Sequence, residues 1–266
     1  MPFAIITNGP TGSGKTGLIR KTLGYYGLQD KEYKTFLIDD LIENNEHYKK
    51  SIDDIINSEC KDGTLCHALR DRLLDPTEEL YAQFGERYVK YRGKTDERWC
   101  NDRKQTCDEF LDDMLDNAIS DGENIVFETV GEYYVSWLVD KLPDYEIYYT
   151  FTLLDFCENI RRNKTRALDQ IQAYVADRTK PAPRLPDVRI SKFSMTVDRI
   201  LKNLWNLMGR KLFGELSAVH RIIVFDNTTL ANVVLYESET VQDINALFDA
   251  IKAIRTVSSV CLCDEL

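Results

Sequence analysis

Short apolar runs alternate along the chain with longer stretches in which apolar residues recur every three or four positions. The apolar runs are typical of buried parallel strands and occupy residues 2–7, 33–38, 124–127, 145–154, 222–225 and 233–236. The longer stretches predict amphipathic helices, the clearest at residues 15–23, 110–118, 156–171, 200–207 and 241–254. Strands that alternate with helices predict an α/β fold, with a mainly parallel sheet covered by helices on both faces.

The stretch between the second and third predicted strands, residues 41–121, reads as mostly helical. It therefore predicts a helical insertion into the sheet. One of its helices is indicated by leucines spaced four residues apart, at Leu65, Leu69 and Leu73.

A second distinctive stretch lies after the fourth predicted strand. Residues 180–186 contain three prolines, and because proline fixes φ and lacks an N–H, they form a stiff loop. This loop belongs to a lid-like segment at residues 155–190. We expect a single domain over residues 1–254 and a flexible tail over residues 255–266.

One turn of the chain has the composition of a phosphate-binding loop. It follows the first predicted strand, opens the first predicted helix and matches G-x-x-x-x-G-K-[ST] with Gly9, Pro10, Thr11, Gly12, Ser13, Gly14, Lys15 and Thr16. The glycines let backbone N–H groups turn toward an anion, and the helix start adds its positive dipole end. The motif predicts a P-loop NTPase-like fold that binds ATP, with Lys15 on the outer phosphates and Thr16 ligating Mg²⁺.

Acidic residues follow two of the predicted strands, at the edge where parallel strands end and ligands bind. Asp39 and Asp40 follow the second strand, and Glu128 and Thr129 end the third. Small-molecule kinases place there the acid that orients the acceptor hydroxyl or takes its proton. We expect Asp39 to be this catalytic base, and Asp40, Glu128 and Thr129 to bind the acceptor. The alternatives are a helix N-cap or turn for the aspartates and a backbone contact for Glu128.

Phosphoryl transfer also needs cations around the transferring group. Residues 161–166 carry several on one predicted helix, and Arg166 is the first candidate among them. Arg178 and Arg184 flank the proline-rich loop and are further candidates. The helical pattern places Arg166 opposite the apolar face, so a solvated surface is the alternative. These arginines contribute to catalysis if the lid-like segment folds over the nucleotide.

The composition narrows the class of protein. The formal net charge is −10, which weighs against nucleic acid and anionic membranes as partners. No apolar run is long enough to span a bilayer, and we expect no leader peptide before the first strand. The seven cysteines are odd in number and contain no C-x-x-C pair, which argues against a disulfide framework or structural zinc site. We expect a cytoplasmic protein.

Together these motifs resemble the zeta-toxin family of P-loop kinases and, more distantly, polynucleotide 5′-kinases. The similar segments are residues 8–16, 38–40, 124–129, 178–181, 224–227 and 233–236. The resemblance implies that Asp39 is the catalytic base, that Glu128 contacts the substrate and that Arg166 and Arg178 contact the γ-phosphate. It also implies a sugar-nucleotide acceptor, because members of the family phosphorylate UDP-N-acetylglucosamine. The chain departs from the family in having adjacent acids after the second strand and in having residues 41–44 where a basic residue is expected.

The sequence thus predicts an ATP- and Mg²⁺-dependent phosphotransferase that acts on a hydroxyl group of a small molecule. No N-K-x-D motif of a Ras-like GTPase is present. Two alternatives stay open: a non-catalytic nucleotide-binding scaffold or regulator, and a polynucleotide 5′-kinase with a local basic groove. No segment that would bind an antitoxin is evident.

Overall fold

The structure is a computed structural model. It describes residues 1–59, 72, 79–91, 100–101, 104–185, 190–217, 219–228, 233–239, 244–245 and 247–252. The chain forms two compact units. The sheet unit comprises residues 1–36, 117–161 and 190–266, and the helical unit comprises residues 37–116 and 162–189. The expectation of a single domain over residues 1–254 stays a prediction, and the expected tail lies outside the described residues.

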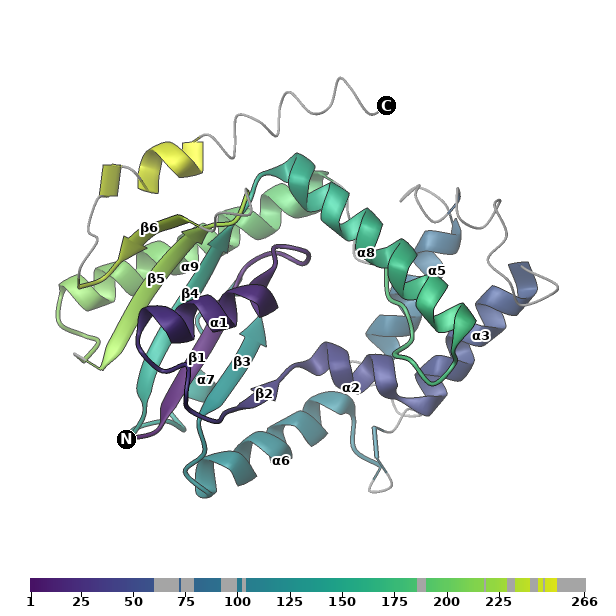
Figure 1. The fold of residues 1–266 in the computed structure, drawn as a ribbon, viewed down its shortest axis with the longest axis horizontal. Coiled ribbons are helices and arrows are strands. Elements are labelled where there is room, and N and C mark those ends of the chain that lie inside the picture. The colour runs from purple at the N-terminus through teal and green to yellow at the C-terminus, as the bar shows by residue number, and fades with distance from the viewer. Residues whose placement is uncertain are drawn as a thin grey trace. The chain divides into compact units, whose positions relative to one another are not determined.

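Among the described residues, six strands form one sheet in the order β2-β3-β1-β4-β5-β6 (Figure 1). The strands are β1 (Phe3–Asn8), β2 (Lys34–Phe36), β3 (Ile125–Thr129), β4 (Glu146–Leu153), β5 (His220–Asp226) and β6 (Val233–Glu237). Neighbouring strands are parallel except β6, which pairs antiparallel with β5 at one edge. The predicted α/β fold with a mainly parallel sheet is confirmed.

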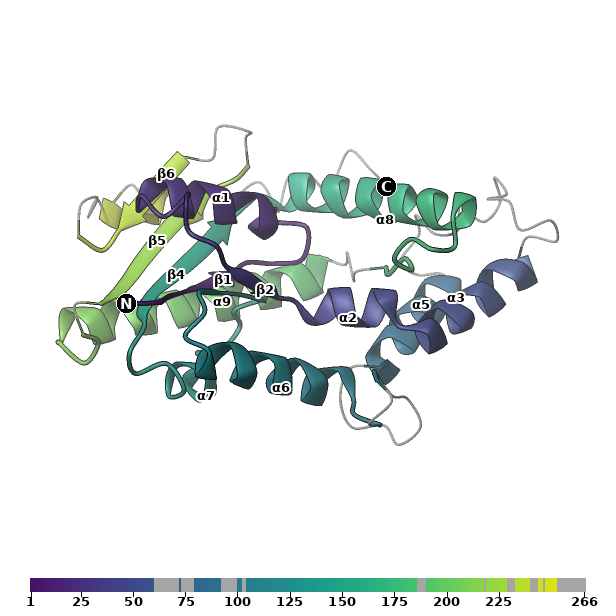
Figure 2. The ribbon, with the colours of Figure 1, turned by 60° about the horizontal axis from the view of Figure 1, so that its bottom comes forward.

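Helices cover both faces of this sheet. In both ribbon views α1 (Lys15–Tyr25) lies on one face and α9 (Ile190–Leu212) on the other (Figure 2). The apolar stripe of α1 packs on strand residues that point to the same side, and this cluster comprises Phe3, Ile5, Ile19, Leu23, Val126 and Tyr148. Because every residue of β1 is buried, the turn that follows β1 starts from a fixed point in the core.

The helical unit contains the insertion that the sequence predicts between β2 and β3. Its helices are α2 (Ile38–Asn44), α3 (Glu46–Glu59), α5 (Glu79–Tyr91) and most of α6 (Cys107–Ser120). Most of α8 (Phe156–Ala176) also belongs to this unit, and a short helix in the sheet unit, α7 (Ser136–Val139), was not predicted. The helix expected around Leu65, Leu69 and Leu73 lies outside the described residues.

The second strand ends earlier than the sequence indicates. β2 ends at Phe36, Leu37 is extended with φ −136° and ψ 111°, and α2 begins at Ile38. The prediction that Asp39 and Asp40 stand at a strand end is therefore wrong, since both lie in the first turn of α2. The positive end of the helix dipole favours acidic residues at this place.

Two further expectations can be compared with the structure. No helix among the described residues is long and apolar enough to cross a membrane. Cys100 and Cys107 carry free thiols, as expected, whereas Cys157 near the start of α8 is disulfide-bonded.

Candidate active site

The turn between β1 and α1 forms an anion cradle. Gly12 and Gly14 have φ angles of 80° and 82°, a left-handed conformation that favours glycine. The N–H of Ser13 donates to the Pro10 carbonyl at 3.1 Å and closes the turn. The helix α1 that follows has no side-chain cap and no acidic residue in its first turn. Its positive end is therefore suited to an anionic ligand such as a phosphate group.

Gly9 lets the chain pass closely over the sheet. Its N–H donates to the Val130 carbonyl at 2.9 Å. A Cβ atom at this position would lie 2.6 Å from the Ser13 Oγ and 3.0 Å from the Thr152 Cβ. Only glycine fits here without displacing a neighbour, so the first glycine of the motif is required by packing.

Two buried asparagines hold the outer side of the cradle. The Nδ2 of Asn159 donates to the Thr11 carbonyl at 2.7 Å, and the Nδ2 of Asn227 donates to the Ser13 carbonyl at 2.6 Å. Sequence analysis assigned neither residue to the site. Because Asn227 follows a predicted strand, the sequence places it at the sheet edge where ligands bind but gives it no role, whereas Asn159 lies within a predicted helix and gives no local signal.

The functional side chains of the motif point to partners within the sheet unit. Lys15 Nζ donates to the carbonyls of Gly9 at 2.9 Å and Pro10 at 3.2 Å. The Thr16 hydroxyl donates to the Glu128 Oε1 at 2.9 Å. The structure therefore brings together two of the residues that the sequence proposed for the site, from α1 and β3.

This oxygen pair agrees with the expected cofactors. A hydroxyl and a carboxylate side by side are the hard oxygen ligands that Mg²⁺ prefers, directly or through bound water. With 8% of its surface exposed, Glu128 is held in place by the strand. ATP and Mg²⁺ thus fit the residues present. The Thr129 hydroxyl instead accepts the N–H of Gly131 at 3.1 Å, in the turn after β3.

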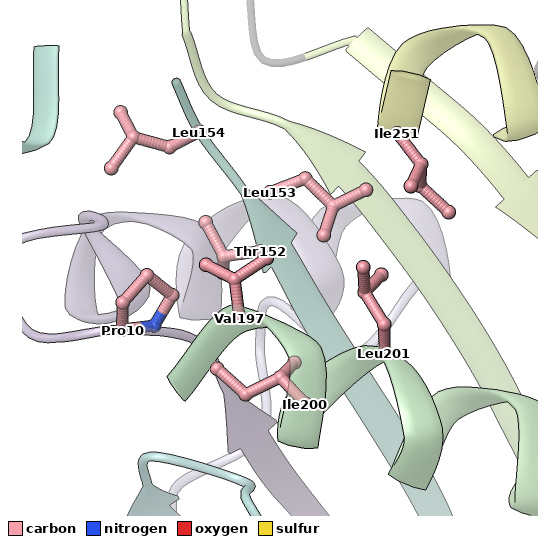
Figure 3. A pocket seen from close by; sticks show the side chains of 8 residues that line it. All are labelled: Pro10, Thr152, Leu153, Leu154, Val197, Ile200, Leu201 and Ile251. Atoms are coloured by element: carbon pink, nitrogen blue, oxygen red, sulfur yellow. The ribbon is translucent and has the colours of Figure 1, made fainter. Parts of the chain in front are cut away.

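An apolar pocket lies beside the cradle within the sheet unit, between the end of β4 and α9 (Figure 3). Its lining residues are Pro10, Thr152, Leu153, Leu154, Val197, Ile200, Leu201 and Ile251. Thr152 is the polar member of the lining, and its Oγ1 has no hydrogen-bond partner among the described residues. The residues that line the pocket thus pack against Pro10 of the P-loop.

The helical unit contains a second cluster, centred on Asp39. Tyr88 donates its hydroxyl to the Asp39 carboxylate, and the Arg184 guanidinium forms an ion pair with the same carboxylate. Arg184 also contacts Glu43, whose Oε1 lies 2.8 Å from the Arg184 Nε. Because 12% of the Arg184 side chain and 5% of the Glu43 side chain are exposed, most of this network is shielded from water.

Burial governs the ionisation of this cluster. Desolvation raises the pKa of Glu43, although the charges of Arg184 and Arg166 oppose the shift. Desolvation also raises the pKa of Asp40, and the nearby Asp39 carboxylate raises it further. For Arg184, burial disfavours the charged form, but the neighbouring acids outweigh it and the pKa is raised. The arginine is therefore firmly charged.

The two arginines proposed from the sequence have different surroundings. Arg166 is 3.8 Å from the Glu43 Oε1 and 41% of its side chain is exposed, so it borders the Asp39 cluster. Arg178 pairs with Asp53 at 2.9 Å and lies over the Tyr174 ring at 4.8 Å. Arg178 thus contacts residues other than the Asp39 cluster.

Arg184 instead provides the cation next to Asp39. The sequence indicates Arg184 as a candidate but gives no role to Tyr88 or Glu43. Glu43 had a usable signal, because it lies four residues after Asp39 on one helix and so shares its face.

One comparison with a solved structure bears on the fold. A solved structure from the PezAT chromosomal toxin–antitoxin system of Streptococcus pneumoniae is 15% identical to the chain, with a TM-score of 0.50 over 98% of this chain and 86% of that one. At this identity the match shows that the chain shares the fold of that structure. A putative kinase from Chloroflexus aurantiacus is 10% identical, with a TM-score of 0.35 over 97% of both chains. No family model matches the chain, and no curated protein does so.

Proposed function

We propose that the protein transfers the terminal phosphoryl group of ATP to a hydroxyl group of a small molecule, with the help of Mg²⁺. The observation that supports this most directly is the contact between Thr16 and Glu128 at an uncapped helix start. A glycine-rich turn alone would bind an anion. The adjacent hydroxyl and carboxylate add a place for the cation that a triphosphate brings with it.

The residues of the sheet unit hold the phosphate donor in this proposal. Lys15 and the loop N–H groups bind the outer phosphates, and Lys15 exchanges its bonds to the Gly9 and Pro10 carbonyls for phosphate oxygens. Thr16 would hold Mg²⁺, and Glu128 would support the metal through water or bind a group of the acceptor. Bound there, the metal would neutralise the charge that develops on the transferred group.

The residues of the helical unit act on the acceptor. Asp39 orients the hydroxyl and takes its proton, while Arg184 and Tyr88 hold the carboxylate in one orientation. Arg166, with its exposed guanidinium, is the cation that neutralises the transferred phosphoryl group. The family resemblance suggests the same part for Arg178, and the positions of Asp40 and Thr129 after predicted strands suggest that they are acceptor ligands.

The phosphate acceptor can be identified by transfer of a labelled phosphoryl group from ATP. The full-length protein is incubated with γ-labelled ATP, Mg²⁺ and a metabolite extract, and the labelled product is identified by mass spectrometry. A sugar nucleotide such as UDP-N-acetylglucosamine is the first pure compound to test. Labelled oligonucleotide ends, in a reaction that salt inhibits strongly, would instead identify a polynucleotide kinase.

Two substitutions test the assigned roles. Lys15→Ala is expected to lose ATP binding, whereas Lys21→Ala, on the exposed side of α1, retains it. Asp39→Asn is expected to bind ATP normally and to lose at least about 100-fold in transfer rate, with Asp30→Asn at an exposed position as its control. Transfer by Asp39→Asn at the rate of the unsubstituted protein refutes the base. ATP binding without any labelled product rejects transfer and leaves a nucleotide-binding protein.

A further inference from the structure

One carboxylate of the helical unit contacts two segments that lie far from it in the chain. Glu43 lies on α2, and 4% of its surface is exposed. Its Oε1 lies 2.8 Å from the Arg184 Nε and 3.8 Å from the Arg166 guanidinium, and its Oε2 lies 3.5 Å from the Gln170 Nε2. Its backbone carbonyl accepts the Ala182 N–H at 2.7 Å. Glu43 thus links α2 to α8 and to the proline-rich loop.

Both arginines beside Glu43 have parts in the proposed function, on which this inference rests. Arg184 holds the Asp39 carboxylate, and Arg166 neutralises the transferred phosphoryl group. The Arg184 guanidinium donates from its Nε to Glu43 and pairs through a terminal nitrogen with Asp39. Because a guanidinium is planar and its donors are fixed in a fork, the contact with Glu43 sets the direction from which Arg184 reaches Asp39.

Arg166 depends on Glu43 in a different way. Its side chain is 41% exposed, and Glu43 is a carboxylate with which it forms an ion pair. A long side chain at the surface adopts many rotamers unless a partner restricts them. The Gln170 amide, one turn farther along α8, contacts the other Glu43 oxygen. The charge of Glu43 therefore draws the Arg166 guanidinium toward the residues around Asp39.

The charge on Glu43 lowers the stability of the fold. Desolvation raises the pKa of Glu43, and the charge of Asp39 adds to the shift, which Arg184 and Arg166 only partly oppose. A raised pKa of an acid means that folding disfavours its charged form. Glutamine would fill the same space without that cost, since Arg184 would keep Asp39 as its counter-ion. Packing alone therefore does not require a carboxylate at this position.

We propose that Glu43 is a positioning residue for phosphoryl transfer, which holds the guanidinium groups of Arg184 and Arg166 in the arrangement that the reaction needs. It acts through the two arginines and takes no part in the bonds that break and form. Without its charge, Arg184 loses the contact that orients it and Arg166 loses an ion pair. The base and the cation are then less often in place together, so the maximal rate falls.

Glu43→Gln tests this role in the full-length protein, supplied with γ-labelled ATP, Mg²⁺ and a metabolite extract. We expect the maximal rate of label transfer to fall by at least about ten-fold and the KM for ATP to stay within about two-fold, because the proposed ATP site lies in the sheet unit. The urea midpoint of the variant should be no lower than that of the unsubstituted protein. Glu46→Gln, at an exposed ion pair on α3, is the matched control and should keep the full rate.

A double variant distinguishes positioning from structural support. If Glu43 acts partly through Arg166, the loss of rate in Glu43→Gln combined with Arg166→Met should be smaller than the product of the two single losses by at least about five-fold. Full activity of Glu43→Gln, single losses that multiply, or a rate that falls together with the urea midpoint would each overturn the inference alone. If the unsubstituted protein transfers no label, the proposed function is refuted and this inference with it.

Discussion

Replacing Thr152 with valine should stabilise the protein, although the residue lies directly beneath the P-loop. Thr152 is fully buried, its Oγ1 has no hydrogen-bond partner among the described residues, and its neighbours in the pocket are apolar. A buried hydroxyl without a partner costs roughly 1–3 kcal/mol in proteins. A methyl group of similar size removes that cost and adds apolar contact, worth about 0.8 kcal/mol for each buried carbon. We expect a net gain of about 1–2 kcal/mol in the free energy of unfolding.

Thr150 on the same strand is the matched control. It is equally buried, but its Oγ1 is hydrogen-bonded to the Thr22 Oγ1 at 3.1 Å. Thr150→Val leaves the Thr22 hydroxyl unpaired in the core and should cost about 1–3 kcal/mol. The two substitutions are chemically identical and should shift stability in opposite directions. Urea titrations followed by circular dichroism measure both. If Thr152→Val destabilises the protein as much as Thr150→Val does, the reasoning about its hydroxyl is wrong.

The remaining predictions concern the Asp39 cluster of the helical unit and the Thr16–Glu128 pair of the sheet unit. Arg184→Met leaves buried acids without their cation and should lower the free energy of unfolding by about 3–5 kcal/mol, measured by urea titration. Arg161→Met removes an exposed ion pair and should change the free energy of unfolding little. Equal effects of the two substitutions would contradict the argument from burial. Because burial raises the pKa of Glu43 above its ordinary value of 4.5, the folded state binds more protons than the unfolded state as the pH rises past that value. The stability that Glu43 contributes is thus complete at low pH and is lost with rising pH. The unfolding free energy should therefore fall more steeply from pH 4.5 upward in the unsubstituted protein than in Glu43→Gln, and parallel curves would refute the shift. Glu128→Gln should raise the Mg²⁺ concentration needed for ATP binding by about ten-fold, measured by calorimetry at several Mg²⁺ concentrations, and an unchanged requirement would remove Glu128 from the metal site.

The parts of the fold that depend on local pattern were predictable from the sequence. β1, β3, β4 and β5 each contain an apolar run, since a parallel strand buried on both faces needs no alternation. The cradle follows from a motif whose glycines adopt the conformations that only glycine tolerates well, at Gly12 and Gly14. The end of β2 was missed because Ile38 continues the apolar run while its backbone already belongs to a helix. An apolar residue at a boundary satisfies both patterns equally.

The partners of the charged residues were less predictable. Arg178 and Arg184 flank the same proline-rich loop, and nothing in the local sequence distinguishes them. The structure pairs Arg184 with Asp39 and Glu43, and Arg178 with Asp53. Such pairings depend on which helices pack together, and a periodic pattern identifies the buried face of a helix without naming its partner. The catalytic roles of these residues stay predictions.

The two asparagines that bond the P-loop show that the binding site needs more of the chain than the sequence motif contains. All eight residues of the motif lie within the first 16 positions, but the side chains that bond the Thr11 and Ser13 carbonyls come from Asn159 and Asn227. During synthesis the polypeptide therefore contains the complete motif long before it can bind a triphosphate. Nucleotide binding requires that β5 has been synthesised and has paired with the sheet. The ATP affinity of a series of C-terminally truncated chains would therefore show when the sheet is complete.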